Sequence, residues 1–269
     1  MNKKYVVANW KMKPQTWAEA EQILDFTDDY LGSTNEKEFS LVFCPPPVFL
    51  EEVGKILKTS HFEHEAELGA QDIAFDDSTA LTGLGEGSRV EPGISVEVSG
   101  PMLQKLGVRY VIVGHSERRW KLGESDEVVN KKLKAVLRNE MTPIVCLGEK
   151  IRDDNFKDFL KEQIGKTFAD LGQDELKRCV VAYEPVWAIS SNPGAKPDSP
   201  EESIKAIKTI WGEINKLGGG ETWVPTLYGG SVNSQNVTDF IGQKEIDGVL
   251  VGGASVNKEE FVKILSLVK

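Results

Sequence analysis

The feature that most constrains the fold of this 269-residue chain is a regular alternation of short apolar runs with longer amphipathic stretches. The short runs are rich in β-branched residues and nearly continuous in apolar side chains, as is typical of strands buried on both faces. Strands that alternate with helices predict parallel βαβ units. We expect strands at 5–8, 39–43, 67–70, 110–113, 143–146, 180–183, 224–228 and 248–251, and helices at 17–31, 49–57, 96–106, 124–139, 156–171, 201–217, 236–241 and 258–268.

Eight such units follow one another without an intervening linker. This count, in a chain near the usual length of roughly 250 residues, predicts an α/β fold, a (βα)8 barrel of the kind called a TIM barrel. We expect a single domain over residues 1–269. An open, doubly wound parallel sheet is the alternative, since one misassigned strand would blur the distinction.

Charge and cysteine content narrow the class of partner. The formal net charge is −10, which argues against a nucleic acid or an anionic membrane surface as partner. No apolar run is long enough to span a bilayer. Cys44, Cys146 and Cys179 are odd in number and far apart, which favours a reducing compartment over a disulfide framework, so we expect a cytoplasmic protein.

Polar side chains occur where three of the expected strands end. Lys11 follows the strand at 5–8, His115 follows 110–113, and Glu184 follows 180–183. In a βα barrel the carboxyl ends of the strands carry the chemistry. A carboxylate, an imidazole and an ammonium on one rim could move a proton next to a carbonyl group. Taken singly, each residue is better explained as a cap, a solvated lysine or a strand end held by the following proline.

Two glycine-rich turns follow the last two expected strands, Gly229-Gly230-Ser231 and Gly252-Gly253. Glycine lets a backbone approach a ligand closely, and the N–H groups at the start of the next helix favour an anion. Neighbouring turns in these two positions form the usual phosphate site of a barrel. Together with the three polar residues, they predict a site for a small phosphorylated substrate.

Five segments resemble motifs of the triosephosphate isomerase family, in the same order along the chain. The histidine segment YVIVGHSERR at 110–119 is similar almost letter for letter, and AYEPVWAI at 182–189 resembles the segment with the catalytic glutamate and the first hinge of the lid. The remaining three are ANWKM at 8–12, YGGSV at 228–232 and LVGGAS at 250–255.

The resemblance implies an aldose–ketose isomerase that uses no cofactor and no metal, acts on a small phosphorylated sugar and forms a homodimer. It implies that Glu184 is the base and that His115 is a neutral electrophile, a role for which this family is itself the known example. Lys11, with Asn9 beside it, would hold substrate charge. The other implied positions are the phosphate-binding amides of Ser190, Ser231, Gly252 and Gly253, and the supporting side chains of Glu117, Tyr228, Ile189 and Leu250.

Three loops depart from the family pattern. The lid tip reads SSNPGAKP at 190–197, which is longer than usual and lacks the usual glycines, while Asp72 follows Gln71 where the family usually has asparagine. The loop at 72–93 is enlarged, and either Thr82 or Ser95 with Glu97 aligns with the loop tip that supports the partner subunit.

These changes leave alternatives open. One is an isomerase paralogue for a tetrulose phosphate, since one additional carbon is worth only about 1–3 kcal/mol in a pocket. Another is a non-catalytic barrel that binds sugar phosphates, and a third is a different phosphate-binding barrel enzyme. His61 and His64 are spaced like metal ligands, but no third ligand is evident, and we interpret them as the exposed end of a helix.

Overall fold

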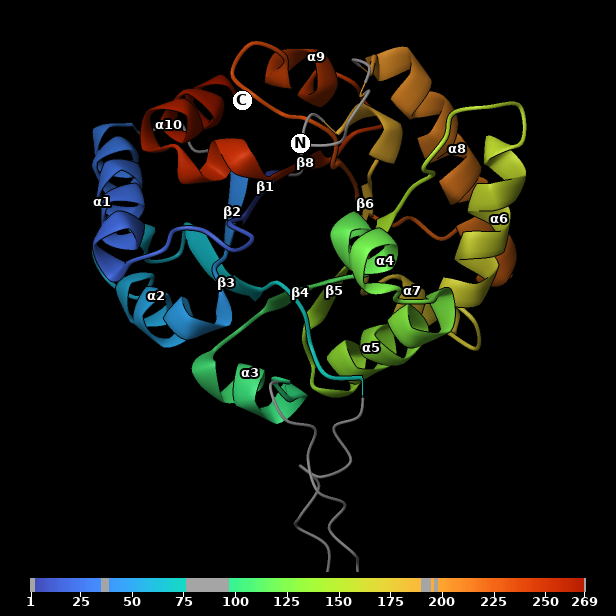
Figure 1. Cartoon of the computed structure of the whole chain (residues 1–269), viewed down its shortest axis with the longest axis horizontal. Helices are drawn as coiled ribbons and strands as arrows, with labels where there is room; N and C mark the ends of the chain where they lie inside the picture. Colours follow the sequence, from blue (N-terminus) through green and yellow to red (C-terminus); the bar gives the residue numbers. More distant parts are fainter. Residues whose placement is uncertain (1–2, 35–38, 76–96, 190–194, 196–197, 269) are drawn as a thin grey trace, which may run out of the picture.

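The computed structural model describes residues 3–34, 39–75, 97–189, 195 and 198–268 of the chain. Its centre is a closed barrel of eight strands in sequence order, every neighbouring pair parallel. Figure 1 shows the helices arranged around this barrel. The strands are β1 (Lys4–Asn9), β2 (Phe39–Cys44), β3 (Ala66–Ala70), β4 (Tyr110–Val113), β5 (Thr142–Leu147), β6 (Val180–Tyr183), β7 (Thr226–Tyr228) and β8 (Gly248–Val251).

Pairing between the first and last strands closes the barrel. Tyr5 lies opposite Gly248, and the parallel register continues along both strands. A side chain at position 248 would collide with the backbone of Tyr5, so glycine permits this close approach. The expected (βα)8 barrel is therefore confirmed, and the open doubly wound sheet is wrong.

The helices agree with the sequence pattern in most places but not in all. The expected helix at 96–106 begins only at Gly100, because Ser99 caps it by accepting the N–H of Met102 at 3.4 Å. The expected helix at 49–57 is divided between η1 and α2, the one at 156–171 ends at Thr167, and the short helix α7 was not expected. The helices are α1 (Trp17–Ser33), η1 (Pro47–Phe49), α2 (Leu50–Ile56), η2 (Ser60–Phe62), α3 (Gly100–Leu106), α4 (Ser116–Leu122), α5 (Asp126–Arg138), α6 (Phe156–Thr167), α7 (Gln173–Leu176), η4 (Val186–Ala188), α8 (Pro200–Leu217), α9 (Val237–Ile241), η5 (Gly253–Val256) and α10 (Lys258–Leu267).

Helix α4 is the largest difference from the expected elements, since no helix was expected between the strand at 110–113 and the helix at 124–139. It forms a separate helix because Gly123, at φ 74°, ends it in the left-handed region. Ser125 then caps α5 by accepting the N–H of Val128 at 3.4 Å. The result is a short helix between β4 and α5.

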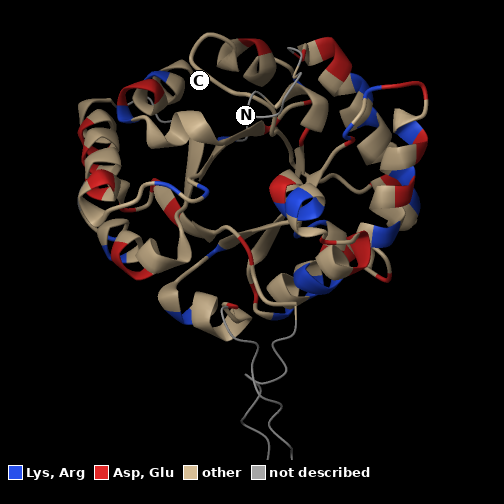
Figure 2. Cartoon of the chain, viewed as in Figure 1, with Lys and Arg blue, Asp and Glu red and all other residues tan. Residues whose placement is uncertain are grey.

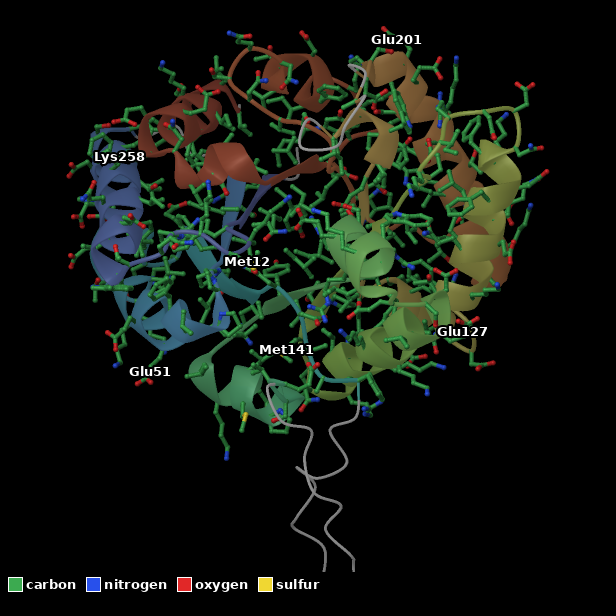
Figure 3. All side chains as sticks on the ribbon, in the orientation of Figure 1. Met12, Glu51, Glu127, Met141, Glu201 and Lys258 are labelled. Carbon is green, nitrogen blue, oxygen red and sulfur yellow. The ribbon has the colours of Figure 1, made fainter. Side chains whose placement is uncertain are left out.

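Apolar side chains fill both sides of the barrel wall. One cluster packs the outer helices onto the strands, and a second fills the barrel interior. Figure 3 shows side chains throughout this volume. Burial of each Val or Leu side chain stabilises the fold by about 1.5–3 kcal/mol. Because side chains fill the interior, the ends of the barrel are left for ligands. The interior cluster consists of Val7, Val42, Cys44, Ile112, Ile144, Cys146, Val180, Ala182, Leu227 and Leu250.

Charged residues lie mainly on the outer helices, where Figure 2 shows acidic and basic positions interspersed. Helix α4 is different, because its charged residues lie over the end of the barrel in the same view. Within the described part of the chain, none of the helices is both long enough and apolar enough to cross a bilayer.

Candidate active site

The three predicted polar side chains meet at one end of the barrel. Lys11 follows β1, His115 follows β4 and Glu184 follows β6, so all three leave carboxyl ends of parallel strands. Nε2 of His115 lies 3.0 Å from Oε1 of Glu184. Nζ of Lys11 lies 3.1 Å from Oε1 of Glu117, two residues beyond His115. The expected convergence is therefore present.

Glu184 is held in place from several directions. Its backbone N–H donates to the carbonyl of Leu147 at 2.7 Å, and its side chain is only 3% exposed. Oε2 accepts the backbone N–H of Ser116 at 2.8 Å, while Oε1 faces His115. Partners on both oxygens fix the carboxylate against α4.

The hydrogen bonds of His115 define its tautomer when the ring is neutral. His115 is the N-cap of α4, and its Nδ1 accepts the backbone N–H of Glu117 at 3.3 Å. An accepting Nδ1 carries no proton, so the ring proton is on Nε2 and points toward Glu184.

Lys11 has an unusual backbone conformation, with φ at 56°. For a residue other than glycine this costs about 1–2 kcal/mol. Its N–H donates to Oδ1 of Asn9 at 3.1 Å. Asn9 is buried, at 4% exposure. Burial acts to raise the pKa of Glu117, but the adjacent Lys11 ammonium and other cationic neighbours outweigh it and lower that pKa. Glu117 therefore remains ionised beside Lys11.

The two glycine-rich turns border the same rim. The hydroxyl of Ser231 donates to the carbonyl of Ala188 at 3.2 Å, and Asn236 donates to the carbonyl of Ser231 at 2.8 Å. A side-chain carbon at Gly252 would lie 3.2 Å from Cε of Lys11, whereas one at Gly253 would meet nothing within 4 Å. The turn after β8 is thus next to Lys11, and the turn after β7 touches the base of the predicted lid.

Of the remaining predicted residues, the structure describes all but Ser190. Tyr228 ends β7 and stacks on Phe240, with ring centroids 3.7 Å apart. Leu250 lies in β8, buried in the barrel interior. Ile189 is the last described residue before the lid, and Ser190 lies outside the described residues, as do most of the lid tip (190–194 and 196–197) and most of the enlarged loop (76–96).

Comparison with known proteins gives a consistent result over the whole length. A sequence model described as triosephosphate isomerase matches residues 4–268. The chain belongs to the triosephosphate isomerase family. A triosephosphate isomerase of Dictyoglomus turgidum is 37% identical, covering 98% of this chain and 99% of the relative. Those of Trichodesmium erythraeum (39% identical, 99% of each chain) and Endomicrobium trichonymphae (38%, 100% of each) are similar to it as well.

Asp72, which departs from the pattern of the triosephosphate isomerase family, is part of a buried charged cluster. Its Oδ2 lies 2.6 Å from Nζ of Lys132 and 2.8 Å from Nε of Arg118. Both cations also contact Oε1 of Glu124, at 2.6 and 2.7 Å. Burial raises the pKa of Asp72 to about 6, against the attraction of the two cations. Among the described residues, Oδ1 of Asp72 and Oε2 of Glu124 are buried without a hydrogen-bond partner.

Sequence reasoning missed Glu149, which supports the first hinge of the lid. Its Oε1 accepts the hydroxyl of Tyr183 at 2.8 Å and Nε1–H of Trp187 at 3.0 Å, and it pairs with Arg152 at 2.8 Å. Glu149 comes just after β5, so its position at a strand end was an available signal.

Ser116 and Gln71 were also missed as functional residues. Ser116 binds Glu184 through its backbone N–H at 2.8 Å and through its hydroxyl at 3.4 Å. Gln71 follows β3, and its side-chain amide contacts the backbone of Lys11 at 2.8 Å. Its place after a strand was again an available signal.

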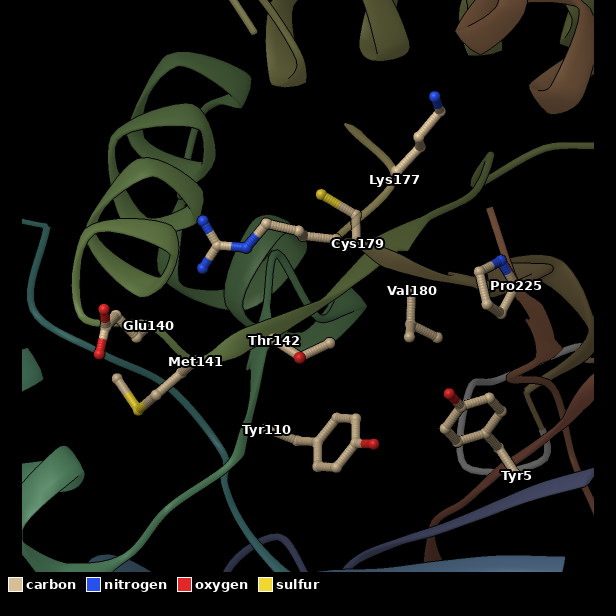
Figure 4. Close-up of a pocket in the computed structure, with 10 residues that line it drawn as sticks. Tyr5, Tyr110, Glu140, Met141, Thr142, Lys177, Cys179, Val180 and Pro225 are labelled. Atoms are coloured by element: carbon tan, nitrogen blue, oxygen red, sulfur yellow. The ribbon is translucent and has the colours of Figure 1, made fainter. Parts of the chain in front are cut away.

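A separate cavity of about 220 Å³ lies at the opposite end of the barrel. Figure 4 shows Tyr5, Tyr110, Thr142 and Val180 around it, all near the amino ends of their strands. None of the predicted site residues lines this cavity, and the amino-terminal face of such barrels usually serves stability.

Histidines outside the site form no metal cluster in the described ranges, which contain no group of three or more potential metal-binding side chains. His61 instead pairs with Asp28, Nδ1 to Oδ2 at 3.2 Å. His64 lies just after η2, at φ 70°, and is exposed.

Proposed function

We propose that this protein interconverts dihydroxyacetone phosphate and glyceraldehyde 3-phosphate. The observation that carries the proposal is the 3.0 Å contact between Nε2 of His115 and Oε1 of Glu184, on the rim that also holds Lys11. A carboxylate and an imidazole N–H this close can act on adjacent atoms of one small substrate. Membership of the triosephosphate isomerase family supports the choice of substrate.

The proposed reaction moves one proton between adjacent carbons. Glu184 removes the proton from the carbon beside the carbonyl, and the released electron pair forms the double bond of an enediolate. Nε2–H of His115 stabilises the negative charge on the former carbonyl oxygen, and Lys11 contributes positive charge. The hydroxyl proton on the other oxygen of the enediolate passes to the former carbonyl oxygen by way of His115, and Glu184 then returns its proton to the former carbonyl carbon. One carbon is oxidised as the other is reduced, so the balance needs no added oxidant or reductant.

In this proposal the phosphate is bound by main-chain amides, from Ser190 in the lid and from Ser231, Gly252 and Gly253 in the two turns. Closure of the lid places Ile189 and Leu250 over the Glu184 carboxylate. Removing water there strengthens the base and protects the enediolate from losing phosphate. The side chains that hold these groups in position are those of Asn9, Glu117 and Tyr228.

We also propose a homodimer in the cytoplasm. The dimer is supported by large apolar side chains exposed near this end of the barrel: Met12 (87%), Val48 (80%) and Leu122 (67%). Met12 is labelled in Figure 3. The compartment is supported by three buried cysteines without disulfides.

The test is side-by-side steady-state kinetics on dihydroxyacetone phosphate and erythrulose phosphate. We expect the larger kcat/KM on the three-carbon substrate. A substantially larger value on the four-carbon substrate would overturn the assignment in favour of a tetrulose-phosphate isomerase. Binding of either compound without turnover would point to a non-catalytic barrel.

A further inference from the structure

Gln71 joins the carboxyl ends of three neighbouring strands. It directly follows β3, and its Nε2 donates to the carbonyl of Lys11 at 2.8 Å and to the carbonyl of Cys44 at 2.9 Å. A primary amide has two N–H groups, so one nitrogen can make both bonds. Cys44 ends β2, and Lys11 is two residues past the end of β1.

Lys11 lies just beyond the reach of the regular sheet. The β1–β2 pairing ends with Asn9 opposite Cys44. Past that point, the N–H of Lys11 goes to the side chain of Asn9 at 3.1 Å, and its carbonyl accepts from Gln71. Side chains rather than strand hydrogen bonds therefore hold the polar backbone groups of a residue at φ 56°.

The left-handed backbone of Lys11 determines where its ammonium lies. The side chain passes beside the turn at Gly252 and ends 3.1 Å from Glu117, at the start of α4. A residue held in a sparsely populated backbone region persists only when its surroundings enforce it. If Lys11 relaxed to an extended conformation, its side chain would leave the site in another direction.

We infer that Gln71 is a positioning residue, which fixes the left-handed backbone of Lys11 and thereby the place of its ammonium in the active site. It contacts neither Glu184 nor His115 in the described hydrogen bonds and acts through Lys11. The inference rests on the proposed function as far as Lys11 is given a role toward substrate.

The first test is Gln71→Met, which keeps the side-chain length and removes both donors. We expect kcat/KM on dihydroxyacetone phosphate to fall about ten- to a hundredfold, with the larger part in KM, because Lys11 binds the anionic substrate throughout the reaction. A crystal structure of the variant should show Lys11 away from its positive φ and its ammonium away from Glu117.

Gln173→Met is the matched control. Gln173 begins α7 at the opposite end of the barrel, and its Nε2 also donates to a backbone carbonyl, that of Glu221 at 3.4 Å. The same substitution there should leave kcat and KM unchanged. A similar loss in both variants would overturn the positioning role.

Gln71→Glu separates positioning from packing and serves if the methionine variant does not fold. An ionised carboxylate cannot donate to the two carbonyls, whereas a protonated one can donate once. The ratio of variant to wild-type kcat/KM should therefore rise as the pH is lowered. A ratio that does not change with pH would overturn the inference. So would a crystal structure of either variant in which Lys11 keeps its positive φ and its ammonium stays beside Glu117.

If the wild type does not turn over triose phosphates, the proposed function fails. The conformation of Lys11 in the variant structures then decides the positioning inference by itself.

Discussion

Nε2 of His115 and Oε1 of Glu184 are 3.0 Å apart, although the two residues leave different strands of the barrel. Both side chains are nearly buried, at 9% and 3% exposure. The contact brings a donor and a base to one point on the rim, and small changes in either side chain should therefore be felt in the reaction rather than in folding.

Glu184→Asp draws the carboxylate back by one methylene. We expect kcat to fall by about a hundredfold or more, since misplacement on the scale of 1 Å can cost this much. The thermal unfolding midpoint should change little. Glu213→Asp is the control, in α8, where Glu213 pairs with Lys216 at 2.7 Å. Unchanged turnover in Glu184→Asp would remove Glu184 from the role of base.

His115 combines two functions that two substitutions can separate. In His115→Asn the amide oxygen can still cap α4, so stability should stay within about 1 kcal/mol. Because the donor toward the substrate is lost, kcat should fall about 10²–10³-fold. His115→Gln reaches further toward Glu184 and should keep more activity but cap α4 less well. Denaturant unfolding and steady-state rates measure both effects, and wild-type kcat in His115→Asn would contradict the assignment.

Asp72 should make stability depend on pH in a predictable direction. Its folded pKa of about 6 exceeds the usual 3.8, so the folded protein holds this proton more tightly than the unfolded chain. The stability contribution is fully present below about pH 3.8 and is lost as the pH rises through about 6. Asp72→Asn removes this loss.

The measurement is the free energy of unfolding of wild type and Asp72→Asn in urea at pH 4.5 and pH 8. Relative to wild type, the variant should gain about 1–2 kcal/mol between the lower and the higher pH. The groups that face position 72 are the same in both proteins and are therefore common to the comparison: Lys132, Arg118 and Glu124. A difference that is the same at both pH values would contradict the raised pKa.

Leu122→Glu tests the proposed dimer. Leu122 is 67% exposed at the end of α4, and a charge there should oppose burial against a second copy. The wild type should sediment at twice the chain mass of 29.8 kDa, and the variant should shift toward the monomer at the same concentration. Ile151→Glu, at a residue 66% exposed in the loop after β5, should leave the mass unchanged. A monomeric wild type would rule out the dimer.

Much of the fold was predictable because it depends on local pattern. Every expected strand is present, and three have the expected bounds, since buried parallel strands are continuous apolar runs bounded by polar loops. Helix α4 was not predicted, because its boundaries depend on the cap at His115 and the left-handed Gly123 rather than on apolar periodicity.

The candidate site was predictable to the extent that its residues follow strands. Lys11, His115 and Glu184 could be placed on one rim from this alone. Gln71 and Glu149 also follow strands, but polar residues at strand ends are common, and only their contacts with Lys11 and Trp187 distinguish them.

By itself, the sequence determined the order of strands and helices and the residues that follow each strand, because apolar spacing and turn residues act over short distances along the chain. The tertiary structure alone decided the register in which β1 pairs with β8, and that it brings Lys11 next to Gly252 from the other end of the chain. It also decided that Asp72 is buried among Lys132, Arg118 and Glu124. These outcomes depend on which groups lose water together when the barrel closes, and that is a property of the folded packing rather than of any local segment.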